Sequence, residues 1–237
     1  MTGNASAARL IKQAEAVVFD VEGTLVDAVP YVLESWRATL GAAGHAVTID
    51  GLQRFSGMDG RDMLAKLIPG LSDAAINSLL KQQAARYKTE GLPRVKSFPE
   101  VRSLFESLRV AGKRVGLATD CSSDECGHYS RLANIQDVVD AGACGDEVRC
   151  GKPHPDLVRL VLDKLKVRPA NAVIVGDTPF DIVAARTVGS AAIGVLTGGY
   201  ACADLLDSGA NSVVSEVWAL LDGPEPSATS MGATVLP

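Results

Sequence analysis

The sequence predicts an α/β protein in which a Rossmann-like, doubly wound parallel sheet carries an inserted all-helical domain. Short apolar runs recur along the chain, at residues 17–19, 115–118, 172–175 and 191–195. They are continuous rather than alternating, as in strands that are covered on both faces. Helical segments lie between most of them, and this alternation is typical of parallel strands joined by right-handed crossovers. One long segment without a strand pattern predicts the helical insertion.

Amphipathic segments between the runs predict the helices that cover the sheet. In residues 99–111 the apolar side chains share one helical face: Val101, Leu104, Phe105 and Leu108. Pro99 suits the first turn of this helix, and Gly112 suits its C-terminal stop. Two further helices are predicted, one that begins at Pro155 and one that ends at Gly189.

Residues 29–94 predict the helical insertion. They contain apolar stripes at helical spacing, which begin at Val29, Met63 and Ile76, and Ser72 is a suitable N-cap for the third helix. Two short crossings, near residues 26–28 and 95–98, would join the insertion to the sheet. Two thin connections of this kind favour a hinge.

The predicted organisation therefore has four parts. Residues 1–15 form an N-terminal extension, residues 16–28 and 96–222 form the α/β core, and residues 29–95 form the helical insertion. Residues 223–237 are rich in small residues and Pro, which predicts a disordered tail.

Composition narrows the class of protein. The net charge is −5 and no block of Lys or Arg stands out, so the sequence argues against a nucleic-acid or acidic-membrane partner. No apolar run reaches the roughly 18 residues of a membrane span, and the N-terminus lacks the apolar centre of a signal peptide. We therefore expect a cytoplasmic protein, as a monomer or a homodimer. The five cysteines include no CxxC pair, which favours free thiols over a zinc site.

Acidic residues follow three of the predicted strands. The first strand ends at Asp20, the second at Thr119 and Asp120, and the third at Asp177, with Asp181 four residues later. A lone Asp after a strand is usually a turn former or a helix cap. Repetition at three strand ends favours a site instead, because the carboxyl ends of parallel strands converge on the crevice where ligands bind.

Such a cluster of carboxylates requires a cation. Carboxylates that repel one another stay ionised at neutral pH only if positive charge compensates them. Oxygen ligands select a hard cation, and Mg²⁺ is the common choice where a substrate phosphate shares the ion. Lys152, next to Pro153 and close to Pro155, is a further source of positive charge.

Four short motifs carry a resemblance to a known family. DVEGTLVD at residues 20–27, LATD at 117–120, GKPHPD from residue 151 and GDTPFD at 176–181 occur in this order. In order and spacing they resemble the haloacid dehalogenase-like (HAD) hydrolase superfamily. The resemblance is to its phosphatases with a helical cap, of the phosphoglycolate phosphatase and β-phosphoglucomutase type. It covers about residues 15–222, and it implies that the helical insertion is the cap.

The resemblance implies a nucleophile and a metal site. Asp20 would attack phosphorus to give an aspartyl-phosphate. Mg²⁺ would be held by the Asp20 carboxylate, the backbone carbonyl of Glu22 and Asp177, with Asp181 assisting directly or through water. Positioning and charge neutralisation are what a phosphoryl transition state mainly requires.

The same resemblance assigns the phosphate-binding side of the site. Thr119 and nearby backbone N–H groups would bind phosphate oxygens, and Lys152 would neutralise charge on the nucleophile and the phosphoryl group. Gly23 would let the chain turn tightly beside the phosphate. Asp120 would contribute through its backbone.

The cap should select the substrate. A loop with two glycines, at residues 54–61, is the segment expected to reach the crevice, and Arg54 or Arg61 could meet an anionic substrate there. A surface turn with solvated arginines is the alternative interpretation.

Glu22 is a departure from the family pattern, in which this acid is usually Asp. The acid protonates the leaving alcohol and later activates water. Either Glu22 is a working general acid/base in an adjusted site, or it marks a weakened or specialised enzyme. The dehalogenase branch of the family is disfavoured because it lacks this second carboxylate.

Three functions remain open at this stage. The sequence favours a Mg²⁺-dependent phosphatase of a small phosphorylated metabolite. A phosphomutase of the same family and a non-catalytic regulator that binds a phosphorylated ligand are the alternatives.

Overall fold

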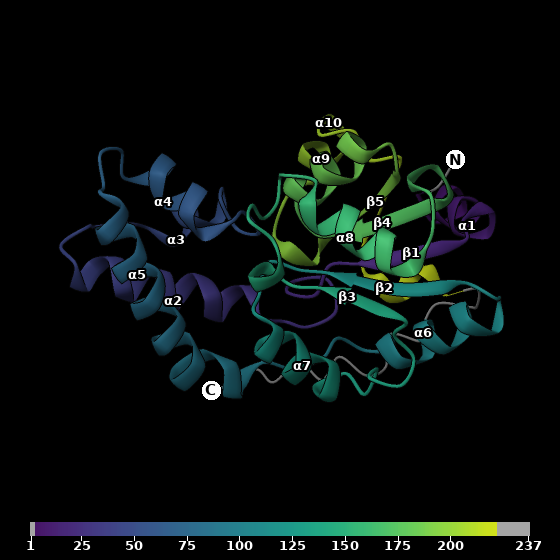
Figure 1. Ribbon diagram of the computed structural model, residues 1–237, viewed down its shortest axis with the longest axis horizontal. Helices are drawn as coiled ribbons and strands as arrows, with labels where there is room; N and C mark the ends of the chain where they lie inside the picture. Colours follow the sequence, from purple (N-terminus) through teal and green to yellow (C-terminus); the bar gives the residue numbers. More distant parts are fainter. Residues whose placement is uncertain (1–2, 222–237) are drawn as a thin grey trace, which may run out of the picture.

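The structure is a computed structural model that describes residues 3–221, and a six-stranded parallel sheet forms its centre (Figure 1). The strands are β1 (Ala16–Phe19), β2 (Arg114–Ala118), β3 (Ala141–Ala143), β4 (Ala172–Gly176), β5 (Ala191–Val195) and β6 (Ser212–Val214). They lie in the order β3-β2-β1-β4-β5-β6. The predicted doubly wound parallel sheet is confirmed.

Side chains of β1 show how both faces of the sheet are buried. Val17 and Phe19 belong to one hydrophobic cluster, whereas Ala16 and Val18 belong to the cluster on the opposite face. All four are fully buried. Burial on both faces explains why the strand is continuously apolar in sequence rather than alternating.

Helices cover the sheet in two layers (Figure 1). One layer contains α1 (Gly3–Gln13), α6 (Val101–Val110) and α7 (Ser123–Leu132), whose apolar residues join the Phe19 cluster. The other contains α8 (Asp156–Leu165), α9 (Pro179–Val188) and α10 (Cys202–Asp207). The predicted N-terminal extension thus includes a helix that contacts β6 and buries Ala7 and Ile11, and Ala14 is buried just after the helix ends.

Local signals explain several of the helix ends. The Ser72 hydroxyl accepts a 3.2 Å hydrogen bond from the Ala75 N–H, as a predicted N-cap should. Gly189 ends α9 with φ at +88°, a conformation that glycine adopts without a side-chain clash. By contrast, α6 begins at Val101 rather than at Pro99, because Glu100 has a left-handed backbone (φ 55°) that helical residues do not adopt.

Two strands were not predicted from the sequence. β3 (Ala141–Ala143) and β6 (Ser212–Val214) each have only three residues. β3 is Ala-Gly-Ala and β6 is Ser-Val-Val, so neither is long enough to present the apolar run that marks the other strands. They are strands because neighbours in the sheet pair with them.

The chain between β1 and β2 forms a helical unit at one end of the sheet (Figure 1). Its main helices are α2 (Val29–Ala42), α3 (Ile49–Gln53), α4 (Gly60–Leu67) and α5 (Asp73–Arg86). A π-helical turn, η1 (Tyr87–Gly91), and a 3₁₀ turn, η2 (Leu92–Arg94), lead back to the sheet. These helices pack around a hydrophobic cluster of their own, which includes Leu33, Trp36, Leu40 and Leu64. We call residues 29–94 the helical insertion.

The two segments that enter and leave the helical insertion lie side by side. The Asp27 N–H donates to the Lys96 carbonyl over 2.8 Å, and the Phe98 N–H donates to the Leu25 carbonyl over 2.9 Å. The remaining η turns are η3 (Gly145–Glu147), η4 (Pro169–Asn171), η5 (Leu196–Gly198) and η6 (Val217–Leu220).

Three further predictions from the sequence concern membrane-spanning helices, the cysteines and the C-terminal segment. Within residues 3–221, no helix is both long enough and apolar enough to cross a bilayer. None of the five cysteines forms a disulfide, and Cys121, Cys126 and Cys144 are buried. The segment predicted to be a disordered tail, residues 223–237, lies outside the described residues.

Candidate active site

The site lies where the strand order reverses. β1 and β4 are neighbours in the middle of the sheet, and the chain leads outward from them in opposite directions. Loops at such a point diverge and leave a crevice at the carboxyl ends of the strands. Asp20 follows β1 directly and Asp177 follows β4 directly, so both carboxylates enter this crevice.

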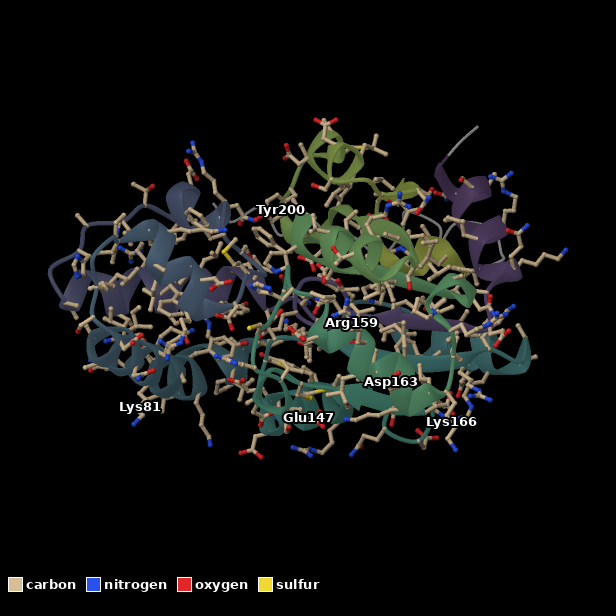
Figure 2. All side chains as sticks on the ribbon, turned by 45° about the horizontal axis from the view of Figure 1, so that its top comes forward. Lys81, Glu147, Arg159, Asp163, Lys166 and Tyr200 are labelled. Carbon is tan, nitrogen blue, oxygen red and sulfur yellow. The ribbon has the colours of Figure 1, made fainter. Side chains whose placement is uncertain are left out.

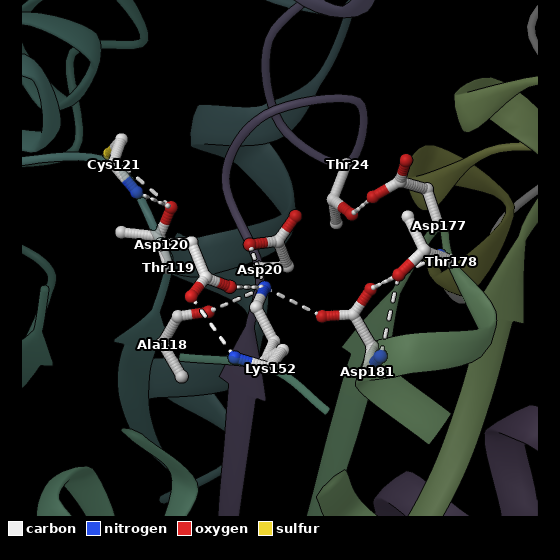
Figure 3. Close-up of polar contacts among 10 residues, drawn as sticks. All are labelled: Asp20, Thr24, Ala118, Thr119, Asp120, Cys121, Lys152, Asp177, Thr178 and Asp181. Carbon is white, nitrogen blue, oxygen red and sulfur yellow. Dashed lines mark hydrogen bonds and ion pairs between the residues drawn. The ribbon is translucent and has the colours of Figure 1, made fainter. Parts of the chain in front are cut away.

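Three carboxylates meet there. Asp20, Asp177 and Asp181 each offer an oxygen, and these oxygens all lie within 4.8 Å of one another. Their side chains come from two loops and the first turn of α9 (Figure 3). The three residues are 5%, 0% and 1% exposed. Such close, buried carboxylates repel one another unless a cation lies among them.

Lys152 supplies one positive charge to this cluster. Its Nζ lies 2.6 Å from Asp20 Oδ1 and 2.8 Å from Asp181 Oδ1, and 3.6 Å from Asp120 Oδ2 (Figure 3). Burial alone would lower the pKa of Lys152, but attraction to Asp181, Asp20 and Asp120 outweighs it and raises that pKa well above its usual value. The ammonium is therefore permanently charged at neutral pH.

One ammonium does not neutralise three carboxylates. Burial raises the pKa of Asp177, and the nearby charges of Asp20 and Asp181 raise it further, well above the usual value. Burial also raises the pKa of Asp20, despite the attraction of Lys152. Among residues 3–221, Asp177 Oδ2 is buried with no hydrogen-bond partner. An orphaned carboxylate oxygen within an all-oxygen donor set fits a hard divalent cation such as Mg²⁺.

Two glycines and a threonine fix the Asp177 carboxylate. The Thr24 hydroxyl donates to Asp177 Oδ1 over 2.9 Å (Figure 3). A Cβ on Gly23 would stand 2.3 Å from Asp177 Oδ2, and a Cβ on Gly198 would stand 1.8 Å from it. Gly23 also has φ at +84°, a backbone that other residues rarely adopt. Only glycine fits at these two positions while the carboxylate keeps its place.

Asp181 is held by the start of α9. Its Oδ2 accepts a 2.6 Å hydrogen bond from the Thr178 hydroxyl and a 3.1 Å bond from the Thr178 N–H. This reciprocal arrangement is a capping box, which satisfies donors at a helix N-terminus. The other oxygen, Oδ1, is the one that contacts Lys152. One carboxylate thus serves both the helix and the site.

The loop after β2 brings Thr119 and Asp120 to the same crevice. Thr119 is 1% exposed, and its hydroxyl accepts a 3.4 Å hydrogen bond from the Cys121 N–H. Asp120 Oδ1 accepts a 3.0 Å bond from the Lys152 N–H, so it fixes the loop that carries the lysine. Burial raises the pKa of Asp120 to about 7, although Lys152 opposes the shift.

Glu22 lies at the edge of the cluster under a tyrosine. The Tyr129 hydroxyl donates to Glu22 Oε1 over 2.8 Å, and the Tyr87 hydroxyl makes a short hydrogen bond with that of Tyr129. Both tyrosines are buried, one on α7 and the other at the start of η1. Burial, with the charge of Glu125, raises the pKa of Glu22 to about 8 against the effect of the Tyr129 bond. The protonated acid is therefore favoured at neutral pH.

A cavity opens from these loops toward the helical insertion. Its volume is about 200 Å³, and its lining includes Glu22, Asp120 and Cys121 on the sheet side. Trp36, Phe55 and other apolar side chains line it on the opposite side. This cavity, which we call the insertion cavity, adjoins the carboxylate cluster and has room for part of a small ligand.

Comparison with known proteins agrees with this geometry. A family model described as "Haloacid dehalogenase-like hydrolase" matches residues 17–195, which include β1 through β5 and the whole carboxylate cluster. The chain belongs to the haloacid dehalogenase-like hydrolase family. The resemblance that the four motifs predicted is thereby confirmed.

Relatives within the haloacid dehalogenase-like hydrolase family include named phosphatases. A "Phosphorylated carbohydrates phosphatase" of Thermotoga maritima is 29% identical over 176 residues, which cover 74% of this chain and 82% of that protein. A "Phosphoglycolate phosphatase" of Rhodospirillum rubrum is 27% identical over 233 residues, with 93% and 96% covered. Among solved structures, a hydrolase from Pseudomonas syringae superimposes with a TM-score of 0.82 at 25% identity, covering 87% and 95% of the two chains.

The structure brings most of the predicted haloacid dehalogenase-like site residues together, but not the two arginines. Arg61 is exposed and pairs with Asp73 over 3.0 Å and with Asn77 on the next helix. Arg54 is also exposed. Neither arginine lines the insertion cavity. The arrangement of Arg61 is that of the alternative interpretation, a surface residue of the helical insertion.

Sequence reasoning missed several residues that support the site. Thr24 lies inside the motif at residues 20–27 and Thr178 inside the motif at residues 176–181, so position within the motif was the available signal. Tyr129 and Tyr87 carried no such signal, because their link to Glu22 depends on packing between segments 107 and 42 residues apart.

Proposed function

We propose that this chain is a Mg²⁺-dependent phosphatase that hydrolyses a small phosphorylated metabolite through an aspartyl-phosphate on Asp20. The observation that carries the proposal is the buried meeting of Asp20, Asp177 and Asp181 within 4.8 Å, with Lys152 against two of them. The names of the phosphatase relatives support the reaction class. In this proposal the helical insertion is the cap that covers the site.

Asp20 is the nucleophile in the first step. One carboxylate oxygen attacks phosphorus, the bond from phosphorus to the leaving oxygen breaks, and the phosphoryl group stays on Asp20. Asp20, Asp177 and the backbone carbonyl of Glu22 would hold Mg²⁺, with Asp181 at its side. The ion supplies charge neutralisation to the phosphoryl oxygens.

Lys152 and Thr119 orient the groups that react. The Lys152 ammonium, at 2.6 Å from Asp20 Oδ1, favours the ionised form of the nucleophile against the effect of burial and offsets negative charge as the phosphoryl group approaches. Thr119 is buried beside the strand end, with a hydroxyl suited to a phosphoryl oxygen.

Glu22 is the general acid and base in both halves of the reaction. In its protonated form it gives a proton to the leaving alcohol, and as a carboxylate it then takes a proton from the water that attacks the aspartyl-phosphate. The Tyr129 hydroxyl holds Oε1, which fixes a side chain one methylene longer than Asp. This arrangement favours a working acid over a vestigial one.

Turnover of para-nitrophenyl phosphate tests the proposal. The wild type should hydrolyse it with Mg²⁺ and lose activity with a chelator, and Asp20→Asn should lower kcat by at least about 10³-fold. Asp163→Asn is the matched control, because Asp163 is exposed on α8, away from the cluster (Figure 2). A wild type that binds beryllofluoride with Mg²⁺ but never turns over would instead support the binding function.

A further inference from the structure

The insertion cavity is apolar on the side where a leaving group would lie. Its sheet side is formed by the loops after β1 and β2, next to the proposed nucleophile. The opposite wall consists mainly of apolar side chains of the helical insertion, which include Leu33, Trp36, Leu52, Phe55, Met58 and Met63. A group attached to a phosphoryl at Asp20 would point into this space.

The ionisable groups that line the cavity, among the described residues, include carboxylic acids and no Lys or Arg. The acids are Glu22, Asp120 and Glu125. Glu125 is fixed there because its carboxylate caps α7 through the Ser122 N–H and hydroxyl. A second anionic group on a bound substrate would therefore meet acidic side chains and no cation in this cavity.

Lys152 and Arg61 both have acidic partners outside the cavity lining. Lys152 is 2% exposed and held between Asp20 and Asp181, so it serves the phosphoryl group. Arg61 pairs with Asp73 on the surface of the helical insertion. Neither can compensate an anionic leaving group inside the cavity.

Uncharged polar groups do reach the cavity. Gln83 lines it from α5 and donates to the Ser35 hydroxyl over 2.8 Å. Ser56 lines it too, and its carbonyl accepts a 3.1 Å bond from Tyr200 of the α/β core (Figure 2). The wall can thus form hydrogen bonds with a hydroxyl or an amide, but it supplies no positive charge to offset a carboxylate or a second phosphate.

We infer that the substrate is a phosphomonoester whose leaving alcohol is uncharged and largely apolar, and that esters with a second anionic group in the alcohol are poor substrates. An anion without a partner loses its hydration in such a cavity and gains nothing in return. The inference rests on the proposed phosphatase function. Such a substrate differs from phosphoglycolate, which appears in the name of the Rhodospirillum rubrum relative.

A matched pair of aryl phosphates tests the inference. Steady-state kcat/KM is measured with Mg²⁺ for 4-methylphenyl phosphate and 4-carboxyphenyl phosphate, which differ in one substituent. The carboxylate makes the phenol the better leaving group, so intrinsic reactivity opposes the expected preference. The methyl compound should be favoured by about 10²-fold. Equal values, or a preference for the carboxylate, would overturn the inference.

Adding a cation to the wall gives the converse test. Gln83→Lys should raise kcat/KM for 4-carboxyphenyl phosphate by about 10-fold relative to the methyl compound. Gln82→Lys is the control, because Gln82 is the neighbouring residue on the same helix, is exposed, and lies outside this cavity. If Gln83→Lys and Gln82→Lys changed the ratio of the two kcat/KM values equally, the result would contradict the inference that the wall of the insertion cavity excludes an anionic leaving group.

Failure of the function and failure of the inference give different results. If neither aryl phosphate nor para-nitrophenyl phosphate is turned over, the proposed phosphatase falls and the inference falls with it. If both aryl phosphates are hydrolysed and phosphoglycolate is preferred to ethyl phosphate, the phosphatase stands and the apolar leaving-group site is refuted.

Discussion

The position of the Glu22 side chain depends on a residue far from it in sequence. Relative to Asp, its side chain has one more methylene, and a misplacement near 1 Å can cost on the order of 10²-fold in rate. The Tyr129 hydroxyl, 2.8 Å from Oε1, constrains that longer side chain. We therefore expect Tyr129 to be a positioning residue for the acid.

Tyr129→Phe should lower kcat by about 10-fold and leave KM nearly unchanged, because it removes a hydrogen bond to an ionisable acid and no contact with substrate. In a Glu22→Asp background the same change should have little effect, since the shorter side chain no longer reaches the hydroxyl. Steady-state kinetics of the four proteins gives this double-mutant cycle.

Tyr87→Phe is the control for that cycle. It removes the hydroxyl that bonds to Tyr129 but keeps the bond between Tyr129 and Glu22. Its effect on kcat should therefore be smaller than that of Tyr129→Phe. Additive effects of Tyr129→Phe and Glu22→Asp on kcat would contradict the positioning role, because they would show that the tyrosine acts independently of Glu22.

At the scale of elements, the loop after β1 has a conformation that leaves space for the Asp177 carboxylate. Gly23 has φ at +84°, and its missing side chain makes room for Asp177 Oδ2. The same loop places Thr24 against the other oxygen of that carboxylate. The turn is thus matched to the position of the Asp177 carboxylate, the proposed metal ligand.

Gly23→Ala should raise the Mg²⁺ concentration for half-maximal activity by about 10-fold or more, because the new Cβ displaces Asp177. Gly44→Ala is the matched control: Gly44 has φ at +86° and open space around the added Cβ. Both variants carry the same backbone strain, about 1–2 kcal/mol. A magnesium titration should separate them, and equal Mg²⁺ requirements would refute the crowding argument.

The sequence predicted elements well where burial imposes a pattern. β1, β2, β4 and β5 are continuous apolar runs because helices cover both faces of the sheet. The two edge strands, β3 and β6, are too short for such a run, and they form strands because a neighbouring strand pairs with each of them. The helix α6 starts later than predicted because Glu100 has a left-handed backbone conformation, which composition does not encode.

The residues of the site could be predicted where they stand at strand ends or in motifs, but not where packing between distant segments brings them in. Asp20, Thr119, Lys152 and Asp177 stand at strand ends or in motifs, so order along the chain located them. The partners of Glu22 come from packing, and the wall of the insertion cavity depends on how helices fold over the sheet. Arg61 was proposed from its charge alone, and its pairing with Asp73 depends on a helix that the motif does not include.

At the scale of the whole molecule, the carboxylate cluster should make stability depend on pH and on metal. Burial raises the pKa of Asp120 to about 7 and that of Glu22 to about 8, and it also raises those of Asp20 and Asp177. A carboxyl with a raised folded-state pKa favours folding below its unfolded-state pKa. That contribution is lost as pH rises through the folded-state pKa.

Without metal, the protein should therefore lose stability between about pH 5 and pH 8, and the stabilisation by Mg²⁺ should grow over the same range. Thermal unfolding with a chelator and with Mg²⁺, at both pH values, measures this. Asp177→Asn should reduce the metal-dependent rise in Tm at pH 8. A rise in Tm that is equal at both pH values would contradict the account of the cluster.

The most direct measurement locates the phosphoryl group during turnover. Glu22→Gln is mixed with para-nitrophenyl phosphate and Mg²⁺, quenched in acid, and the phosphorylated peptide is identified by mass spectrometry. Because the good leaving group needs little acid catalysis while the water lacks its base, the account predicts a burst of about one nitrophenol per chain and phosphate on Asp20. Phosphate on any other residue, or wild-type turnover that persists in Asp20→Asn, would contradict it.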